Sequence, residues 1–330
     1  MVMSFTALHR IALVAGALWA GAAFPLWAAE VQWRPDRPVR FVLPFAPGGA
    51  ADVVARVLAP QLQELTGQPW VVDNRGGAGG TIAAEIVARA NPDGHTVFLG
   101  ISTAITVSPL LMKLPIDVTM DLAPVAMATA AQYMLVLHPS VAAGNLKDFV
   151  ALAKSKPGVL NYASTGVGGP SFMSMALFSH RSGIRMTAIP YKGGGPAANA
   201  MLGGEVQAMF LSIVAALPHV KAGRLKALAV SGPQRATVAP DIATVAELGY
   251  PGFSATTWYG LLLPGKSPGR IAAALDAAAA KALAVPDVVE VITRQGAEVS
   301  YKGRKEFAAH IRQETGMWAQ VIKEAGIKGE

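Results

Sequence analysis

The sequence predicts an α/β fold with two doubly wound sheets, one in each of two lobes that are joined by crossing strands. Short apolar runs alternate with segments of helical periodicity along the chain, which is typical of parallel sheets. Several of these runs are apolar without alternation, as expected for strands that are buried on both faces. The 330 residues suffice for two domains, yet no Pro-, Gly- or Ser-rich linker separates them.

The apolar runs are bounded by Gly, Pro or polar residues, so each is predicted to be a strand. In chain order they are Val39–Phe45, Trp70–Val72, Thr96–Leu99, Met134–Leu137, Leu160–Ala163, Met186–Ile189, Val206–Leu211, Leu225–Val230 and Tyr259–Leu263.

Helical spacing predicts a helix that buries Val54, Leu58 and Leu62, with an irregular turn at Pro60 and a glycine cap at Gly67. A long terminal helix is predicted from the spacing of Phe307, Ile311, Trp318 and Ile322.

Without a linker, two domains are expected to be joined by strands that cross between them. We place the crossings near Ala128–Leu137 and Ala227–Pro233. The first domain is then discontinuous and holds residues 30–130 and 234–330, whereas the second is the insertion 131–233.

The N-terminus is predicted to be a secretory signal peptide over residues 1–29. A short segment ending in Arg10 precedes the apolar stretch Ile11–Trp27, and Ala28-Ala29 follow. A membrane anchor is the alternative, but the apolar stretch is short for a bilayer span. The chain has no cysteine, which excludes disulfides and a lipid-modified N-terminal Cys. We therefore expect a soluble protein of the bacterial periplasm.

The net charge of +7 is spread along the chain. The longest basic cluster, Lys302–Lys305, adjoins Glu306 and is typical of a solvated face. The sequence therefore does not favour nucleic-acid binding.

Two glycine-rich turns follow predicted strands and precede predicted helices. One is Pro47-Gly48-Gly49, and the other is Ser164–Gly169, which includes Thr165 and Gly166. A strand–glycine turn–helix unit directs unpaired backbone N–H groups and a positive helix end to one spot, which favours an anion. Two such units in two lobes are predicted to hold one anionic ligand. For the glycine turn, a tight turn without a ligand is the alternative. Asp52 is expected to lie in the first turn of the following helix and to bond backbone N–H groups.

Hydroxyl groups follow two of the predicted strands, at the strand ends where ligands bind in open α/β sheets. Ser102 and Thr103 follow one strand, and Ser164 and Thr165 follow another. A turn or helix-cap hydrogen bond is the alternative for each. The loop Asn74–Gly80 lacks the Lys-Ser/Thr of a phosphate-binding loop and a correctly phased G-x-G-x-x-G. It is therefore expected to shape the cleft or to turn into the next helix. Tyr191–Pro196 is a third glycine turn.

The sequence gives no positive sign of catalysis. Its six histidines are scattered, and it has no G-x-S-x-G or H-E-x-x-H motif. We therefore predict no catalytic residue, metal or cofactor. An exported hydrolase that uses Ser102, Ser164 or Ser171 remains an alternative, and it requires a base close to the serine.

Several motifs together resemble the Bug-type extracytoplasmic solute receptors, the substrate-binding subunits of tripartite tricarboxylate transporters. The motifs are Arg37–Gly49, Asp52–Arg56, Asn74–Gly80, Pro92–Thr96, Pro190–Gly193 and Leu217–Gly223. The resemblance covers about Trp33 to Ile327. It implies a two-lobed Venus-flytrap periplasmic binding protein, acting as a monomer, that captures a small carboxylate and delivers it to membrane permease subunits. A ligand sensor for a membrane kinase is the alternative.

The resemblance implies binding positions in both lobes. In the first lobe these include Phe45, Pro47, Gly48, Gly49, Ala50 and Ala51, and in the second they include Gly169, Phe172 and Leu211. The chain has Ala50-Ala51, Phe172 and Leu211 where the family often has Ser or Thr, His and Asp. It also has Ser108-Pro109 where an Asn-Pro is usual. These differences predict a ligand with a hydrophobic or aromatic body and one carboxylate.

Overall fold

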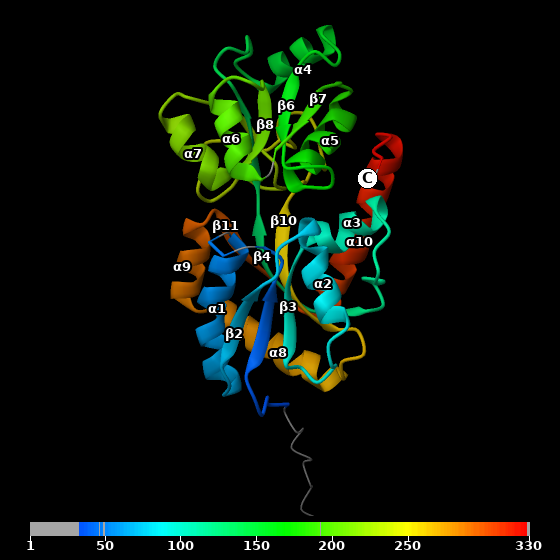
Figure 1. Ribbon diagram of the computed structural model, residues 1–330. Helices are drawn as coiled ribbons and strands as arrows, with labels where there is room; N and C mark the ends of the chain where they lie inside the picture. Colours follow the sequence, from blue (N-terminus) through cyan, green and yellow to red (C-terminus); the bar gives the residue numbers. More distant parts are fainter. Residues whose placement is uncertain (1–32, 46, 49, 192, 329–330) are drawn as a thin grey trace, which may run out of the picture. The chain divides into compact units, whose positions relative to one another are not determined.

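The computed structural model describes residues 33–45, 47–48, 50–191 and 193–328. The predicted signal peptide and Gly49 lie outside the described residues. The compact unit that begins at Trp33 contains two β-sheets, each with parallel and antiparallel strands, and the helices that pack against them (Figure 1). The predicted α/β fold with two sheets is therefore confirmed.

The first sheet has six strands in the order β11-β4-β10-β3-β1-β2. β1 pairs in parallel with β2 and β3, whereas β10 runs antiparallel to β3 and β4. The strands are β1 (Val39–Leu43), β2 (Trp70–Asn74), β3 (Thr96–Ile101), β4 (Leu122–Ala131), β10 (Thr257–Pro264) and β11 (Ala297–Lys302).

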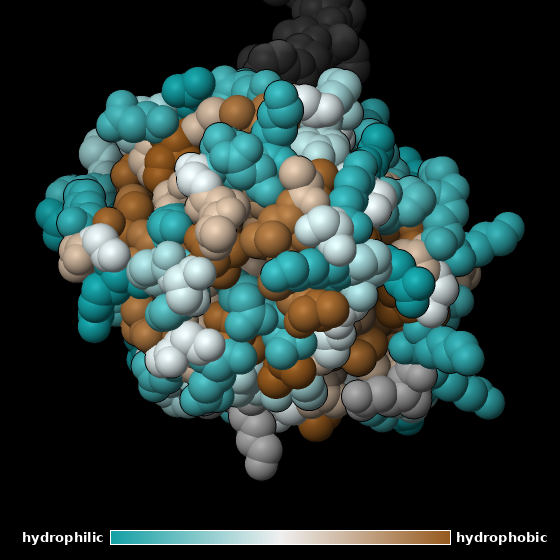
Figure 2. All heavy atoms as spheres, turned by 90° about the horizontal axis from the view of Figure 1, so that it is seen from above, coloured by the Kyte–Doolittle hydropathy of each residue, from teal (hydrophilic) through white to brown (hydrophobic). Residues whose placement is uncertain are grey.

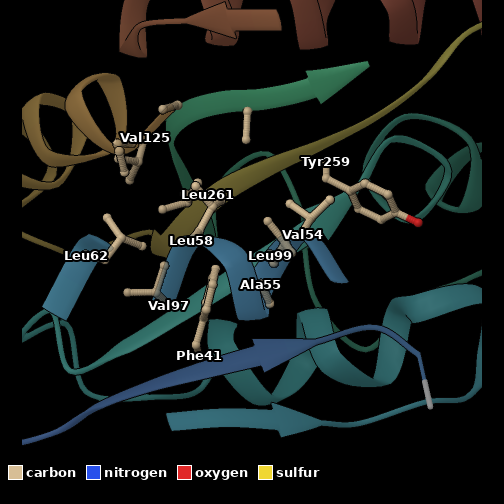
Figure 3. Close-up of a cluster of buried hydrophobic side chains, with 14 of the residues drawn as sticks. Phe41, Val54, Ala55, Leu58, Leu62, Val97, Leu99, Val125, Tyr259 and Leu261 are labelled. Atoms are coloured by element: carbon tan, nitrogen blue, oxygen red, sulfur yellow. The ribbon is translucent and has the colours of Figure 1, made fainter. Parts of the chain in front are cut away.

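Both faces of the first sheet are buried. Phe41 and Leu99 face the cluster formed with α1 (Ala50–Thr66), α8 (Gly269–Leu283) and α9 (Pro286–Arg294), part of which Figure 3 shows. The adjacent residues Val42 and Phe98 belong to a cluster on the opposite side, with α2 (Thr81–Ala88) and α10 (Arg304–Glu324). Burial on both faces explains why these strands are apolar without alternation.

Helix α1 begins at Ala50 and continues through Pro60. Pro60 therefore does not interrupt the helix. Gly67 follows the helix with a φ of +83°, and its N–H donates to the Gln63 carbonyl over 2.8 Å. This left-handed residue is the predicted glycine cap.

The second sheet has five strands in the order β7-β6-β8-β5-β9. β6 pairs in parallel with β7 and β8, and β5 runs antiparallel to β8 and β9. The strands are β5 (Tyr133–Leu137), β6 (Asn161–Ser164), β7 (Thr187–Pro190), β8 (Ala208–Ser212) and β9 (Lys226–Val230). Its helices are α4 (Leu146–Ser155), α5 (Pro170–Ser182), α6 (Gly194–Leu202) and α7 (Ile213–Lys221). From above, hydrophobic residues are interspersed among hydrophilic ones (Figure 2).

The chain passes from the first sheet to the second between β4 and β5, across the single residue Gln132. It returns after β9. Phe253 and Ala255 still pack in the core of the second lobe, and β10 of the first sheet begins at Thr257. The domain limits stated above remain a prediction, and from this packing we propose that the second lobe extends to Ala255.

Helix α10 forms a further connection between the lobes. Phe307 and Ile311 pack in the core of the first lobe, whereas Trp318 and Val321 pack in the core of the second. The predicted terminal helix is therefore present, and its two ends pack in different cores. No helix among the described residues is long and apolar enough to cross a membrane.

Candidate ligand-binding cavity

A cavity of about 920 Å³ is lined by residues of both lobes. The first lobe contributes Phe45, Gly48, Ala78, Gly79, Thr103, Ser108 and Met112. From Tyr133 onward the lining belongs to the second lobe and comprises Tyr133, Thr165, Val167–Ser171, Gly193–Gly195, Ala198, Met209–Ser212 and Ala215. Both lobes therefore contact any molecule that fills this cavity.

Topology explains why these distant segments meet. Gly48, Ala78 and Thr103 follow the parallel strands β1, β2 and β3, and Thr165 and Gly193 follow β6 and β7. The carboxyl ends of parallel strands lie at one edge of a sheet, and that edge is where ligands bind in open α/β folds.

Several helix N-termini, with their backbone N–H groups, lie at the cavity. The lining includes the starts of α5 at Pro170 and α6 at Gly194, and Ser212, which directly precedes α7. In the first lobe it includes Ala78 and Gly79, in the short 3₁₀ turn before α2. First-turn N–H groups have no partner inside their own helix and carry partial positive charge. The arrangement therefore favours an anion.

In the first lobe, a carboxylate holds the glycine turn. Gly48 has a φ of +88°, and its N–H donates to Oδ2 of Asp52 over 3.1 Å. The same oxygen accepts from Nε of Arg56 at 2.8 Å, and this bond lowers the pKa of Asp52. The expectation for Asp52 is confirmed. The Gly48 N–H itself is engaged within its turn, so the expectation of an unpaired amide was wrong there.

In the second lobe, hydroxyl groups hold the glycine turn. The Gly166 N–H donates to Oγ of Ser164 at 3.0 Å, and the Thr165 N–H donates to Oγ of Ser171 at 2.8 Å. Gly168 has a left-handed φ of +76°. Neutral oxygens therefore fix this turn at the start of α5, and they add no negative charge beside the cavity. The expectation of unpaired amides was also wrong for Thr165 and Gly166, whose N–H groups are engaged within this turn.

Six of the predicted binding residues line the cavity, and they come from both lobes. They are Phe45, Gly48, Thr103, Thr165, Gly169 and Leu211. The other described ones lie beside it without lining it. They are Pro47, Ala50, Ala51, Ser102, Ser164, Gly166 and Phe172.

The non-lining residues have other partners. Ala51 packs in the hydrophobic core, and Ser164 accepts the Gly166 N–H. The Phe172 ring packs near Tyr162, with ring centroids 6.4 Å apart. Of the substitutions that suggested a more apolar cleft, Leu211 lines the cavity and Phe172 does not.

Several lining residues have no motif in the sequence that predicts them. Met112, Tyr133, Met209 and Ser212 lie in or beside strands and short turns that carry no glycine signal. Only position could have indicated Tyr133, which lies at a crossing, and Ser212, which ends β8. Met112 follows α3 (Ser108–Leu111) and Met209 lies near the start of β8, and neither has a signal in the sequence. Gly193–Gly195 had a visible signal, as a third glycine turn.

The described lining contains no Lys, Arg, His, Asp or Glu. No base within that lining is therefore available to activate Ser108, Ser171 or Ser212 as a nucleophile. In the part of the chain that the structure describes, no group of His, Asp or Glu side chains has the geometry of a metal site. The chemistry of the lining is hydrogen bonding and apolar contact.

Residues 54–327 match the family model described as "Tripartite tricarboxylate transporter family receptor". The chain is 38% identical over 311 residues to protein BugT of Bordetella pertussis, covering 94% of each chain. A solved structure of an R. palustris protein with adipate has a TM-score of 0.79 at 30% identity, covering 90% of this chain and 99% of that one. MatC from Rhodopseudomonas palustris, with bound malate, has a TM-score of 0.74 at 35% identity, covering 87% and 99%.

Proposed function

Because the chain belongs to the tripartite tricarboxylate transporter receptor family, we propose that it captures a small carboxylate between its lobes and delivers it to the transporter's membrane permease. The observation that carries this proposal is the cavity itself, where helix starts from both lobes meet in a described lining without charged side chains. The structures with adipate and malate support the ligand class. We further propose that the protein acts in the periplasm after export by the predicted signal peptide.

The energetics of such a site are adequate for capture. Each helix start contributes about 0.3–1 kcal/mol to holding an anion, and each N–H bond to a carboxylate contributes roughly 1.5–3 kcal/mol. Several of these contributions together support a micromolar dissociation constant, about −8 kcal/mol, after the cost of ordering the lobes.

The lining also supports a ligand with an apolar body. Phe45, Met112, Met209, Phe210 and Leu211 lie around the cavity together with the hydroxyl-bearing and glycine residues. Leu211 is 2% exposed and occupies the position where the family often has Asp. A ligand ammonium group therefore has no carboxylate at this position, whereas a hydrophobic or aromatic body finds apolar contacts. We propose that the ligand carries one carboxylate on a hydrophobic or aromatic body.

Native purification followed by denaturation and mass spectrometry tests the ligand directly. Calorimetry of the purified protein with benzoate, adipate, malate, citrate and glutamate tests the class. We expect benzoate to bind with micromolar affinity and citrate and glutamate to bind much more weakly. Binding of citrate or glutamate without benzoate contradicts the apolar body, and binding of no carboxylate contradicts the receptor function.

Delivery to a permease needs a cellular experiment. Deletion of the gene is expected to abolish uptake of the identified acid, and restoring the gene is expected to restore uptake. Intact uptake together with a lost transcriptional response to the acid would instead assign the protein to the sensor class.

A further inference from the structure

Tyr133 lies where the cavity meets the crossing between the lobes. It is the first residue of β5 and is separated from β4 of the other sheet only by Gln132. Its side chain lines the cavity. Among the described lining residues, Tyr133 alone is placed at a crossing, since the others follow strand ends or lie in strands and helices of one lobe.

The backbone of Tyr133 is tied to the returning segment. Its N–H donates to Oγ of Ser231 at 2.9 Å, and its carbonyl accepts the Ser231 N–H at 2.8 Å. Ser231 is fully buried, and its Oγ donates to the carbonyl of Ala255 at 2.6 Å. Ser231 therefore joins the outgoing strand to both ends of the segment that leads back to the first lobe.

The side chain of Tyr133 makes a second link to the same return path. Oγ1 of Thr257, the first residue of β10, donates to the phenol oxygen of Tyr133 over 3.1 Å. Burial raises the pKa of Tyr133, so the phenol stays protonated and keeps its own hydrogen for another acceptor. The side chain that lines the cavity is therefore also the one that is bonded to the second crossing strand.

We propose that Tyr133 is a positioning residue that couples occupancy of the cavity to the angle between the lobes, an inference that rests on the proposed binding function. Tyr133 and Thr257 belong to different crossing segments, so rotation of one lobe against the other changes the distance between their oxygens. Their hydrogen bond favours the arrangement in which the lobes touch.

The lobes do touch in this structure. A Cβ built on Gly168 of the second lobe would lie 3.2 Å from Cδ1 of Leu111, which follows β3 of the first. Thr237, which follows β9, donates through Oγ1 to Glu298 of β11 over 2.9 Å. The Tyr133–Thr257 bond is therefore present in an arrangement in which the lobes touch, and under this proposal its loss favours opening.

The chain has no cysteine, which permits site-specific spin labelling. Glu64→Cys on α1 and Lys156→Cys after α4 place labels at exposed positions, one in each lobe. Pulsed electron resonance then measures the distance between labels in the unliganded protein. We expect Tyr133→Phe to shift the ratio of closed to open populations about 2- to 10-fold toward the longer distance, as for loss of one hydrogen bond.

Thr257→Val removes the same bond from the other side. If the bond carries the effect, this variant and the double variant show the same shift as Tyr133→Phe alone. Tyr301→Phe is the matched control, because its hydroxyl bonds Asp276 within the first lobe at 2.7 Å, and the distances should not change. An unchanged distance distribution in both Tyr133→Phe and Thr257→Val overturns the proposal, as does an equal shift in the control.

A second measurement distinguishes failure of this inference from failure of the proposed function. Adipate, malate and benzoate are added to the labelled protein and to labelled Tyr133→Phe. If the parent protein binds none of them, the receptor function fails, while the unliganded distances still decide the role of Tyr133. If the parent protein binds an acid and closes, Tyr133→Phe should close less at equal occupancy. Equal closure in both proteins rejects the coupling alone.

Discussion

The two lobes differ in whether they bury carboxyl groups. Both bury hydroxyl side chains, such as Ser102 and Ser164, but among the described residues only the first lobe buries carboxyl groups, those of Asp52 and Glu314. The difference extends to the glycine turns, since a carboxylate holds Gly48 and a hydroxyl holds Gly166.

Because of this difference, the two lobes are expected to contribute differently to anion binding and to the pH dependence of stability. In the first lobe, Asp52 offsets the positive end of α1 close to the cavity. In the second lobe, hydroxyls fix the turn without added charge, so the start of α5 keeps its attraction for an anion. The second lobe is therefore expected to provide most of the attraction for the carboxylate. The first lobe is expected to provide most of the pH dependence of stability.

Glu314 gives the largest expected effect of a charged group on stability. It is 9% exposed, lies on α10 and accepts a hydrogen bond from Nε1 of Trp258 at 2.6 Å. Burial raises the pKa of Glu314 to about 7 from an ordinary value of 4.5. The folded state therefore resists ionisation, and stability falls as pH rises from about 4.5 to about 7. Glu314→Gln should raise the free energy of unfolding by about 3 kcal/mol at about pH 8.

Urea denaturation of parent and variant across this pH range checks the prediction. The difference should shrink to near zero below about pH 4.5, where the carboxyl group is protonated in both states. Glu306→Gln is the matched control, because Glu306 is exposed in the first turn of the same helix. A Glu314→Gln variant that is less stable at about pH 8 would show that the buried carboxylate is stabilised by its surroundings.

A pair of glycine substitutions compares the two turns directly. Gly48 and Gly168 both have a left-handed φ, so Ala at either position should cost about 1–2 kcal/mol in strain. They differ in their neighbours, since a Cβ at Gly48 meets nothing within 4 Å, whereas one at Gly168 lies 3.2 Å from Leu111 of the other lobe. Similar losses of thermal stability are expected, with an additional loss of ligand affinity, about tenfold, in Gly168→Ala.

Thermal unfolding and calorimetry with the acid identified for the parent protein separate these effects. Equal affinity losses in Gly48→Ala and Gly168→Ala would mean that contact between the lobes at Gly168 does not contribute to closure around the ligand.

Asp52→Asn tests whether charge matters in the turn of the first lobe. The Arg56 bond lowers the pKa of Asp52, so its ionised form stabilises the fold above the unfolded value of 3.8, and this contribution is lost as pH falls below that value. We expect Asp52→Asn to lose about 1 kcal/mol at about pH 6. Melting curves should converge at about pH 3. A constant difference at every pH would assign the effect to altered packing in the turn.

The sequence predicted the α/β fold because most strands are short, apolar and bounded by Gly or Pro. It missed β4 and β11. β4 reads LAPVAMATAA, which has few β-branched residues and favours helix by composition, so its strand state depends on pairing with β10 and β11. β11 has only one neighbour in the sheet, and most of its residues are only partly buried, which weakens the apolar signal.

The candidate site was predictable where glycine or hydroxyl residues follow a strand, as at Gly48 and Thr165. Tyr133 could not be found this way, because its position in the cavity depends on the crossing between the sheets and on its bond to Thr257, far away in sequence. Ser212 likewise lines the cavity only because β8 lies centrally beside β6 and β5. Local patterns identify turns, whereas the crossings that unite two lobes arise from tertiary pairing.

The smallest expected effect concerns the link between the lobes at the end of α10. Oε2 of Glu324 lies 2.9 Å from Nε2 of His180 on α5, and both side chains are about one-third exposed. Such an exposed pair contributes about 0–1 kcal/mol, because water screens it and the side chains lose freedom. Trp318 and Val321 already anchor this end of α10 in the core of the second lobe. Glu324→Gln should therefore leave thermal stability and lobe distances nearly unchanged, whereas Trp318→Ala should cost about 3–5 kcal/mol. If Glu324→Gln instead opened the lobes, polar contact rather than apolar packing would hold α10 to the second lobe.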